Sequence, residues 1–472
     1  MVSEESIYTV GELIKAGVLY KPLDGNHGGI HPKGNDFVES GIPFVMASDM
    51  SNGQVDTKTC KFISADQAST LRKGFAITGD VLISHKATIG RTAIVGEIES
   101  EFIVLTPQVT YYRVKDTNQL NNRYLKYYFD SYEFQGLLNQ WAGGGSTRAY
   151  LGITGQLKLP IKILDIQKQK AIAHILGSLD DKIELNRQMN ETLEAMAQAL
   201  FKSWFVDFDP VIDNALAAGN DIPDEFIERA EQRKAIEKKD HSDMQVLFPD
   251  EFEFTEEMGW IPKGWAVTTL ESLAVISSSK RIFAKEYKTE GIPFFRGKEI
   301  SLLSKGESFT QDIFISKERF QELKDKFGAP IAGDLLLTSV GTIGNVYLVQ
   351  KGDEFYFKDG NLTWFSKYKT EIRGSYLSTW FNTRQAYLAI EDIKIGSTQQ
   401  AITISSLNGI EIVKPKDEII GLFNELSDSF SEKQTILIKD IRTLAKIRDT
   451  LLPKLMSGEL RIPDSAVILE EF

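Results

Sequence analysis

Residues 186–210, NRQMNETLEAMAQALFKSWFVDFDP, carry the strongest structural signal in the chain. They read as the second half of one long helix that begins near Ile166. Apolar residues recur along it at alternating steps of four and three, at Ile172, Leu176, Leu179, Ile183, Leu193, Ala197 and Leu200. This spacing is typical of a coiled-coil seam. Asn186 and Asn190 occupy two seam positions, where polar residues often fix the helix register or the number of partners.

The predicted helix ends in four aromatic residues, which we call the aromatic cluster: Phe201, Trp204, Phe205 and Phe208. Pro210 follows, and proline disfavours helical backbone at the residue before it. We therefore expect the helix to stop just ahead of Pro210.

A second helix with the same spacing ends the chain. Its residues Phe423, Phe430, Leu437, Ile441, Leu444 and Leu451 lie 251 positions after Ile172, Leu179, Asn186, Asn190, Leu193 and Leu200. We expect the two helices to pack as an antiparallel pair. The residues predicted to hold this pair and to dock partners are Leu179, Ile183, Asn186, Asn190, Leu193, Leu200, Phe201, Trp204, Phe205, Leu437, Ile441, Leu444, Leu451 and Leu452.

The remaining sequence contains two copies of one globular unit. The tetrapeptide GIPF at 41–44 recurs at 291–294, and GDVLISHKATIG at 79–90 recurs as GDLLLTSVGTIG at 333–344, with six of twelve residues identical. Such a long period indicates duplication of a whole domain and its helix, since solenoid repeats are about 20–50 residues long. Glycine, proline and apolar residues match, whereas the polar residues between them differ. Two related sites with different specificities are therefore predicted.

These patterns predict an α+β chain with two mixed α/β domains, separated by two long antiparallel coiled-coil-like helices. The expected segments are a first domain, a central helix, an acidic linker, a second domain, a C-terminal helix and a tail, at 1–163, 164–210, 211–258, 259–414, 415–460 and 461–472. At about 1.5 Å per residue, the helices are long enough to hold two domains roughly one DNA turn apart.

Composition limits the function. The net charge is −12 over 472 residues, but 211–260 alone carries −9, so both predicted domains are close to neutral. DNA binding by them is possible but weak without help. The single cysteine, Cys60, excludes an internal disulfide and a cysteine zinc site, which fits a reducing cytoplasm. No signal peptide or membrane span is expected.

Catalytic signals are weak throughout. The sequence has no Pro-Pro methyltransferase loop, no G-x-G-x-x-G fingerprint and no Walker A loop. His27 and His31 have the spacing of a helical metal site, but the glycines and proline around them favour exposed loop histidines. Pro223-Asp224 with Glu237-Lys238-Lys239 resembles a nuclease signature, yet it lies in the charged linker, where a solvated helix is favoured. We expect no catalytic residue and no metal.

DNA contacts are predicted where polar residues follow the repeated motifs. Arginine pairs with guanine and glutamine with adenine in the major groove, so Arg148 in one copy and Gln399-Gln400 in the other suggest a change of specificity. The alternative for each residue is an ordinary exposed side chain or a mobile connection. The candidates are Lys86, Arg91, Ser146, Thr147, Arg148, Arg296, Lys298, Thr338, Ser397, Thr398, Gln399 and Gln400.

The chain resembles the specificity subunits of type I restriction-modification enzymes over nearly its whole length. The most specific segments are LEAMAQALFKSWFVDFDPV at 193–211 and LAKIRDTLLPKLMSGEL at 444–460. Supporting segments are GIPF, the repeated GD-x-L motif with TIG, and MGWIPKGW at 258–265.

The resemblance implies two target recognition domains, each reading one half of a split, asymmetric target in double-stranded DNA. It also implies two methyltransferase subunits that dock near the helices and methylate adenine, and two restriction subunits that translocate and cleave DNA. S-adenosylmethionine, ATP and Mg are expected on those partners, with no cofactor on this chain and no membrane contact. The main alternative is a scaffold with two protein-binding domains and no DNA contact. An enzyme acting on DNA alone is disfavoured.

Overall fold

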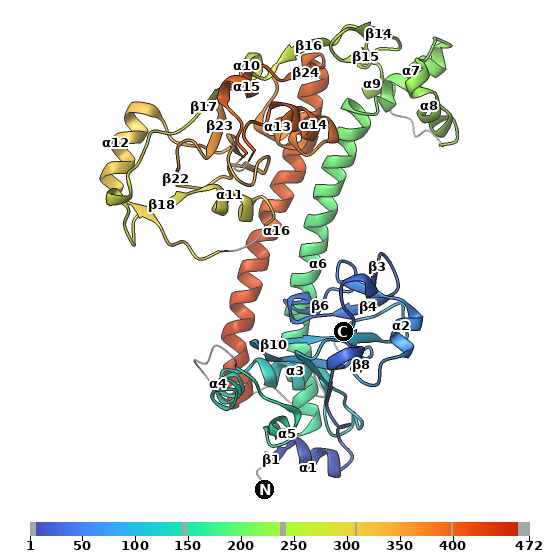
Figure 1. Cartoon of the computed structure of the whole chain (residues 1–472), viewed down its shortest axis with the longest axis vertical. Coiled ribbons are helices and arrows are strands. Elements are labelled where there is room, and N and C mark those ends of the chain that lie inside the picture. Colours follow the sequence, from blue (N-terminus) through green and yellow to red (C-terminus); the bar gives the residue numbers. More distant parts are fainter. Residues whose placement is uncertain (1–5, 144–148, 237–241, 307–308, 398–399, 461–472) are drawn as a thin grey trace. The chain divides into compact units, whose positions relative to one another are not determined.

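The structure is a computed structural model that describes residues 6–143, 149–236, 242–306, 309–397 and 400–460. It divides into two compact units: unit 1 comprises Met1–Gln188 with Ile438–Phe472, and unit 2 comprises Met189–Leu437. Each unit combines a globular part with portions of two long helices, α6 (Ile166–Phe205) and α16 (Asp417–Ser457) (Figure 1). Among the described residues, no helix combines the length and apolar character that crossing a bilayer requires.

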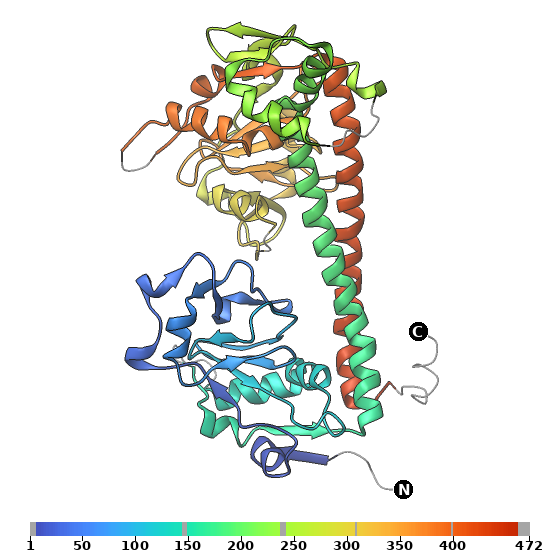
Figure 2. The same ribbon diagram turned by 90° about the vertical axis from the view of Figure 1, so that its right-hand side faces the viewer.

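The two long helices form where the sequence predicts them. They contain 40 and 41 residues, which corresponds to about 60 Å each at 1.5 Å per residue. All fourteen residues predicted for the helix pair are buried or half-buried. In unit 1 Arg448 Nη1 donates to Asp180 Oδ1 at 2.8 Å, and in unit 2 Gln434 Nε2 donates to the Asn190 carbonyl at 3.3 Å. Within each unit α6 and α16 lie side by side and antiparallel (Figure 2).

Asn186 is the unusual member of the seam, because it is fully buried and neither its Oδ1 nor its Nδ2 has a hydrogen-bond partner among the residues that the structure describes. An unsatisfied buried polar group costs about 1–3 kcal/mol. Asn186→Leu is therefore expected to raise the thermal unfolding midpoint of the full chain, at the cost of the register control that a polar seam residue provides. Met189→Leu, an exposed change on the same helix, serves as the control. A lower midpoint in Asn186→Leu would contradict this view.

Unit 1 is built on two sheets. Their strand orders are β2-β12-β9-β10-β6-β5 and β3-β7-β4-β11-β8, and β1 pairs separately with β13. The strands are β1 (Ser6–Thr9), β2 (Leu23–Asp24), β3 (Phe37–Val38), β4 (Ile42–Val45), β5 (Met50–Ser51), β6 (Gly53–Val55), β7 (Lys61–Ile63), β8 (Phe75–Ala76), β9 (Val81–Lys86), β10 (Thr88–Ile94), β11 (Ile103–Leu105), β12 (Val109–Tyr112) and β13 (Pro160–Ile163). The short helices are α1 (Val10–Lys15), α2 (Ala65–Ser69), α3 (Asn122–Asp130), α4 (Tyr132–Trp141) and α5 (Ile153–Gln156).

Unit 2 has smaller sheets. Their strand orders are β17-β23-β20-β21 and β19-β18-β22, with separate pairs β16-β24 and β14-β15. The strands are β14 (Phe252–Thr255), β15 (Gly259–Pro262), β16 (Ala266–Thr269), β17 (Val275–Ser277), β18 (Ile292–Phe295), β19 (Phe314–Ile315), β20 (Leu335–Thr338), β21 (Val346–Leu348), β22 (Tyr356–Phe357), β23 (Leu362–Ser366) and β24 (Glu411–Lys414). The short helices are α7 (Asp209–Ala218), α8 (Ile227–Lys234), α9 (Ser242–Gln245), α10 (Leu270–Leu273), α11 (Gly297–Leu303), α12 (Lys317–Phe327), α13 (Gly374–Phe381), α14 (Arg384–Ile393) and α15 (Ile404–Asn408).

The repeated GD motif makes the same turn in both units. The carboxylate of Asp80 accepts from the Ile77 N–H at 2.9 Å, and that of Asp334 accepts from the Ile331 N–H at 3.0 Å. Burial raises the pKa of both carboxyl groups, and hydrogen bonds counteract that rise only in part. The shared turn shows that the repeated sequence encodes one structural frame.

The GIPF motif requires its glycine in both units. The backbone of Gly41 and Gly291 has φ of +154° and +130°. A Cβ atom there would lie 2.5 Å from the Ile63 carbonyl oxygen and 2.3 Å from that of Ile315. A side chain cannot be accommodated at either place, because the adjoining strand approaches too closely.

The acidic insert is a packed part of unit 2. The ring of Phe208 lies 5.7 Å from that of Phe226, and the ring of Trp204 lies 5.2 Å from that of Phe248. Arg229 Nε donates to buried Asp209 at 2.7 Å. Burial acts to raise the pKa of Asp209, but hydrogen bonds from Arg229 and Ser203 lower it below its usual value. The insert therefore covers the aromatic cluster at the end of α6.

Candidate DNA-recognition surface

In unit 1 the predicted contact residues gather at the tip of the β9–β10 hairpin. Lys86 ends β9 and is exposed, and Ala87 makes the turn with φ of +65°. The Leu151 N–H donates to the His85 carbonyl at 3.0 Å, and the Ala87 N–H donates to the Ala149 carbonyl at 3.2 Å. These hydrogen bonds hold the backbone of 149–151, which follows the loop 144–148, beside Lys86. Ser146, Thr147 and Arg148 themselves lie outside the described residues.

Unit 2 repeats this arrangement. The Ile402 N–H donates to the Ser339 carbonyl at 3.0 Å, which matches the Leu151–His85 hydrogen bond of unit 1. The Gly341 N–H approaches the Gln400 carbonyl at 3.4 Å. Ser397 and Gln400 are exposed, whereas Thr398 and Gln399 lie outside the described residues. The two predicted loops therefore leave the same structural position in the two units.

Thr338 takes a structural role. It is fully buried, and its Oγ1 accepts from the Asn345 N–H at 3.0 Å. In unit 1 the Ser84 hydroxyl accepts from the Arg91 N–H at 2.9 Å in the same way. The side chain of Thr338 offers no surface to DNA in this conformation, so we remove it from the contact set. Sequence reasoning overlooked this use of the hydroxyl because its acceptor function depends on the next strand.

The predicted cations differ in their availability. Arg91 is exposed, although its Nη1 donates to the Ala47 carbonyl at 2.9 Å. Arg296 is half-buried and ion-paired, with Nη2 2.6 Å from Glu299 Oε1 and 3.0 Å from Asp312 Oδ1. Lys298 is exposed and makes no ion pair within the described residues. Lys86 and Lys298 are therefore free to meet a phosphate, while Arg296 would first have to leave its carboxylates.

The Arg296–Glu299 pair also perturbs both groups. Hydrogen bonding to Glu299 raises the pKa of Arg296. Burial acts to raise the pKa of Glu299, but hydrogen bonds from Arg296 lower it below its usual value. Both groups therefore stay charged near neutral pH, and the pair anchors the start of α11.

Two aromatic neighbours of the unit 1 hairpin were missed. Tyr150 is 50% exposed, and its ring lies 5.7 Å from that of His85. His85 is fully buried with Nδ1 3.0 Å from the Leu151 carbonyl oxygen, and burial lowers its pKa. The neutral imidazole supports the hairpin, and Tyr150 adds an exposed ring beside Lys86. The available signal was an aromatic residue two positions after Arg148.

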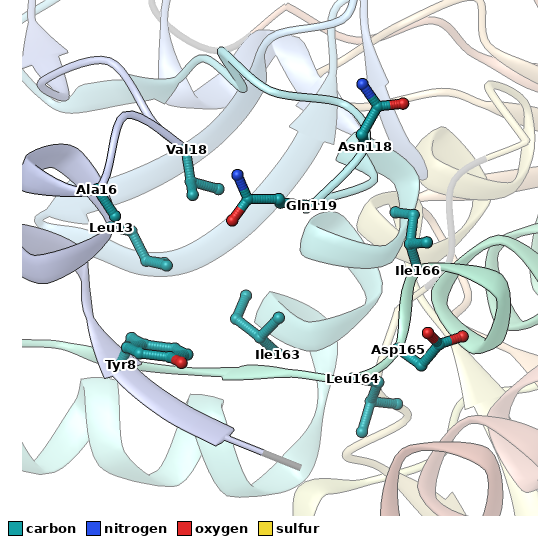
Figure 3. A pocket seen from close by; sticks show the side chains of 10 residues that line it. All are labelled: Tyr8, Leu13, Ala16, Val18, Asn118, Gln119, Ile163, Leu164, Asp165 and Ile166. Carbon is teal, nitrogen blue, oxygen red and sulfur yellow. The ribbon is translucent and has the colours of Figure 1, made fainter. Parts of the chain in front are cut away.

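A separate hollow of about 340 Å³ lies beside the start of α6 and is lined by both apolar and polar side chains (Figure 3). Its acidic residue, Asp165, uses Oδ1 to accept from the Gln167 N–H at 2.9 Å. Within the described residues, no group of three or more His, Cys, Asp or Glu side chains gathers as it would around a metal ion. His27 lies 2.9 Å from Asp24, and His31 packs against Phe44.

Comparison with known proteins identifies the family. The family model of the type I restriction modification DNA specificity domain matches residues 23–195 and 262–440. The chain belongs to this family. Each match contains one globular copy and most of one long helix, which agrees with the duplication seen in sequence and structure. The specificity family is the DNA-recognition part of such systems and not the catalytic part. The alternative of a protein scaffold without DNA contact is not supported.

Individual relatives of the chain are also type I specificity subunits. The HindI type I specificity subunit of Haemophilus influenzae is 30% identical over 64% of this chain and 69% of the relative. The MjaIX specificity subunit of Methanocaldococcus jannaschii is 25% identical over 82% of this chain and 78% of the relative. The crystal structure of the type I restriction-modification S subunit from M. genitalium has the same fold, with a TM-score of 0.51, 12% identity and 96% coverage of both chains.

Proposed function

We propose that unit 1 and unit 2 each read one half of a split, asymmetric DNA target through the hairpin tip and the adjoining loop. The observation that carries this proposal is the shared backbone frame with different polar side chains. The Leu151–His85 and Ile402–Ser339 hydrogen bonds hold the loops alike. Lys86 in one unit corresponds to Val340 in the other, so the two surfaces present different groups to DNA.

Base reading falls to the loops. Arg148 is suited to guanine, and Gln399 and Gln400 are suited to adenine, because their side chains match the bidentate patterns of those bases in the major groove. Lys86, Arg91 and Lys298 contact phosphates, which position the protein without reading sequence. Ser146, Thr147, Ser397 and Thr398 supply smaller hydrogen-bonding groups beside them.

Partner subunits supply the chemistry. Two modification subunits methylate adenine with S-adenosylmethionine, and two restriction subunits use ATP and Mg. The seam residues of the helices face inward, so docking uses the outward apolar residues: Leu185, Ile438 and Ile447 in unit 1, and Met189, Met196 and Ile436 in unit 2. The net charge of −12 supports this division, because an acidic chain needs basic partners to hold DNA firmly.

The complex works in the cytoplasm. Burial raises the pKa of the Cys60 thiol to about 11, so this side chain behaves as an inert apolar group. A single buried thiol requires no oxidising compartment.

Adenine-methylation mapping tests the function. Cells carrying this chain together with its modification subunit are expected to show one split, asymmetric methylated motif. Cells carrying either protein alone should show none, because sequence reading and methyl transfer reside on different chains. The full complex with Lys86→Gln should methylate the same motif less completely.

A different outcome would remove the proposal. A stable complex of the two proteins that methylates no motif, and whose affinity for duplex DNA is independent of salt, would contradict DNA reading by this chain. Methylation of an unsplit motif would contradict the assignment of one half-site to each unit.

A further inference from the structure

Unit 1 carries a second polar surface that the hairpin tip does not account for. A groove of about 650 Å³ is lined by five cationic or potentially cationic side chains: His27, His31, Lys33, Lys61 and Lys86. We call it the basic groove. Of the described residues that line it, none is an aspartate or glutamate. The chain as a whole has a net charge of −12, so a lining with cations and no carboxylate differs in charge from the chain around it.

The three lysines come from separate elements. Lys33 lies in the loop between β2 and β3, Lys61 opens β7, and Lys86 closes β9. None of them makes an ion pair within the described residues. Lys61 Nζ lies 4.4 Å from the centre of the Phe37 ring, which orients the side chain without neutralising it. Their charges therefore remain available to an anion.

Neighbouring lysines of unit 1 behave differently. Lys73 is paired with buried Asp24, and Lys126 Nζ lies 2.8 Å from Asp130. The His27 ring also contacts Asp24, with Nε2 at 2.9 Å. Asp24 itself is absent from the groove lining. Buried Asp24 is thus outside the lining, as is exposed Asp36, whose carboxylate accepts from the Lys33 N–H at 2.7 Å, and the lining itself presents positive charge.

The basic groove is continuous with the recognition surface, because Lys86 belongs to both. Lys86 ends the strand that leads into the hairpin tip, next to the position where the loop 144–148 is anchored. A DNA strand whose bases face the hairpin tip would pass its neighbouring phosphates along this side of the unit. A regular polyanion matches several separated cations better than a single small anion does.

We propose that the basic groove binds the sugar-phosphate backbone of DNA next to the half-site read by unit 1. This inference rests on the proposed function and assigns Lys33 and Lys61 a role that the sequence did not predict. The groove contacts phosphates and not bases, so it adds affinity for every sequence equally.

The test uses the full chain in complex with its modification subunit. Affinity is measured against salt concentration for a duplex containing the methylated motif and for a scrambled duplex. Lys33→Gln with Lys61→Gln should lower the slope of log affinity against log salt by about two, since each phosphate contact contributes about 0.9. The Kd for both duplexes should rise by the same factor, about tenfold or more at 0.1 M salt.

Two further variants act as controls. Lys33→Arg with Lys61→Arg keeps both charges and should keep the wild-type slope. Lys158→Gln removes an exposed lysine that follows α5, which Figure 1 shows at the end of unit 1 opposite β3 and β4. It should leave the slope unchanged. A matching thermal midpoint in all variants shows that the fold is intact.

The outcomes separate the two proposals. An unchanged slope in the Lys33→Gln, Lys61→Gln variant, with sequence-specific binding by the wild type, overturns the groove alone. A loss confined to the motif duplex also overturns it, because the groove would then read bases. A wild-type complex that prefers neither duplex and shows no salt dependence overturns the proposed function itself.

Discussion

Phe201→Ala is expected to lower the free energy of unfolding of unit 2 by about 3–5 kcal/mol, the usual cost of deleting a buried phenylalanine side chain. Phe201 belongs to the aromatic cluster and is fully buried. Its ring lies 5.0 Å from that of Phe205, 4.9 Å from that of Tyr376 and 5.6 Å from that of Phe423. The substitution therefore removes contacts that join α6 to α13 and α16 within the unit.

Tryptophan fluorescence can follow this loss during denaturant unfolding. Five of the six tryptophans, Trp204, Trp260, Trp265, Trp364 and Trp380, belong to unit 2, whereas Trp141 belongs to unit 1. The fluorescence transition therefore reports mainly on unit 2, even where a chain of two units does not unfold in one step. The midpoint should fall to a lower denaturant concentration.

Met196→Ala is the matched control, because Met196 lies on the same helix and is 49% exposed. It should shift the midpoint only slightly. Equal shifts in the two variants would show that the aromatic cluster contributes no more than helix propensity does.

The long helices could be predicted because their signal is local and periodic. The steps of four and three identify the seam, and the structure buries or half-buries that face from Ile172 to Leu200. The repeated glycines could also be predicted, since Gly41 and Gly291 stand in a motif that occurs twice. Because the domain is duplicated, each position can be compared with its equivalent in the other copy. Residues that match in both copies belong to the scaffold, and those that differ are variable.

Other features depend on contacts between distant segments. The pairing of Arg296 with Asp312 and the burial of Thr338 follow from neighbouring strands and not from residue type. A solvated helix was expected for the charged run within the insert, and whether the insert packs on the helices or on a partner was left open; in the structure Phe226 and Phe248 pack on the aromatic cluster. The sequence periodicity of a single helix or strand cannot predict such contacts between distant segments.

The basic groove shows the same limit. Lys33 and Lys61 are 28 positions apart and lie in unremarkable sequence, yet the fold places both on one lining with Lys86. The histidines beside Lys33 were weighed only as metal ligands or exposed loop residues. Their position next to lysines from other elements became apparent only in three dimensions.

Exchanging residues 1–163 for the corresponding domain of another family member is expected to change one half of the methylated motif completely and leave the other half unchanged. Unit 2, Met189–Leu437, contains none of the exchanged residues, so its loops and hairpin tip are retained. Adenine-methylation mapping with the same modification subunit measures the result. The reciprocal exchange of 259–414 is the control and should change only the other half.

The exchange succeeds only if the new domain fits the helices that remain. The core of unit 1 extends on both sides of the junction at residue 163. Leu159 and Ile161, which would be exchanged, share one buried cluster with residues of α6 and α16 that would remain: Ile172, Leu176 and Leu455. A donor with apolar residues of similar volume at the equivalents of Leu159 and Ile161 preserves that cluster, since volume-conserving changes usually cost less than about 1.5 kcal/mol. If such a folded chimera altered both halves of the motif, the two units would have to read DNA jointly, and the assignment of one half-site to each unit would be wrong.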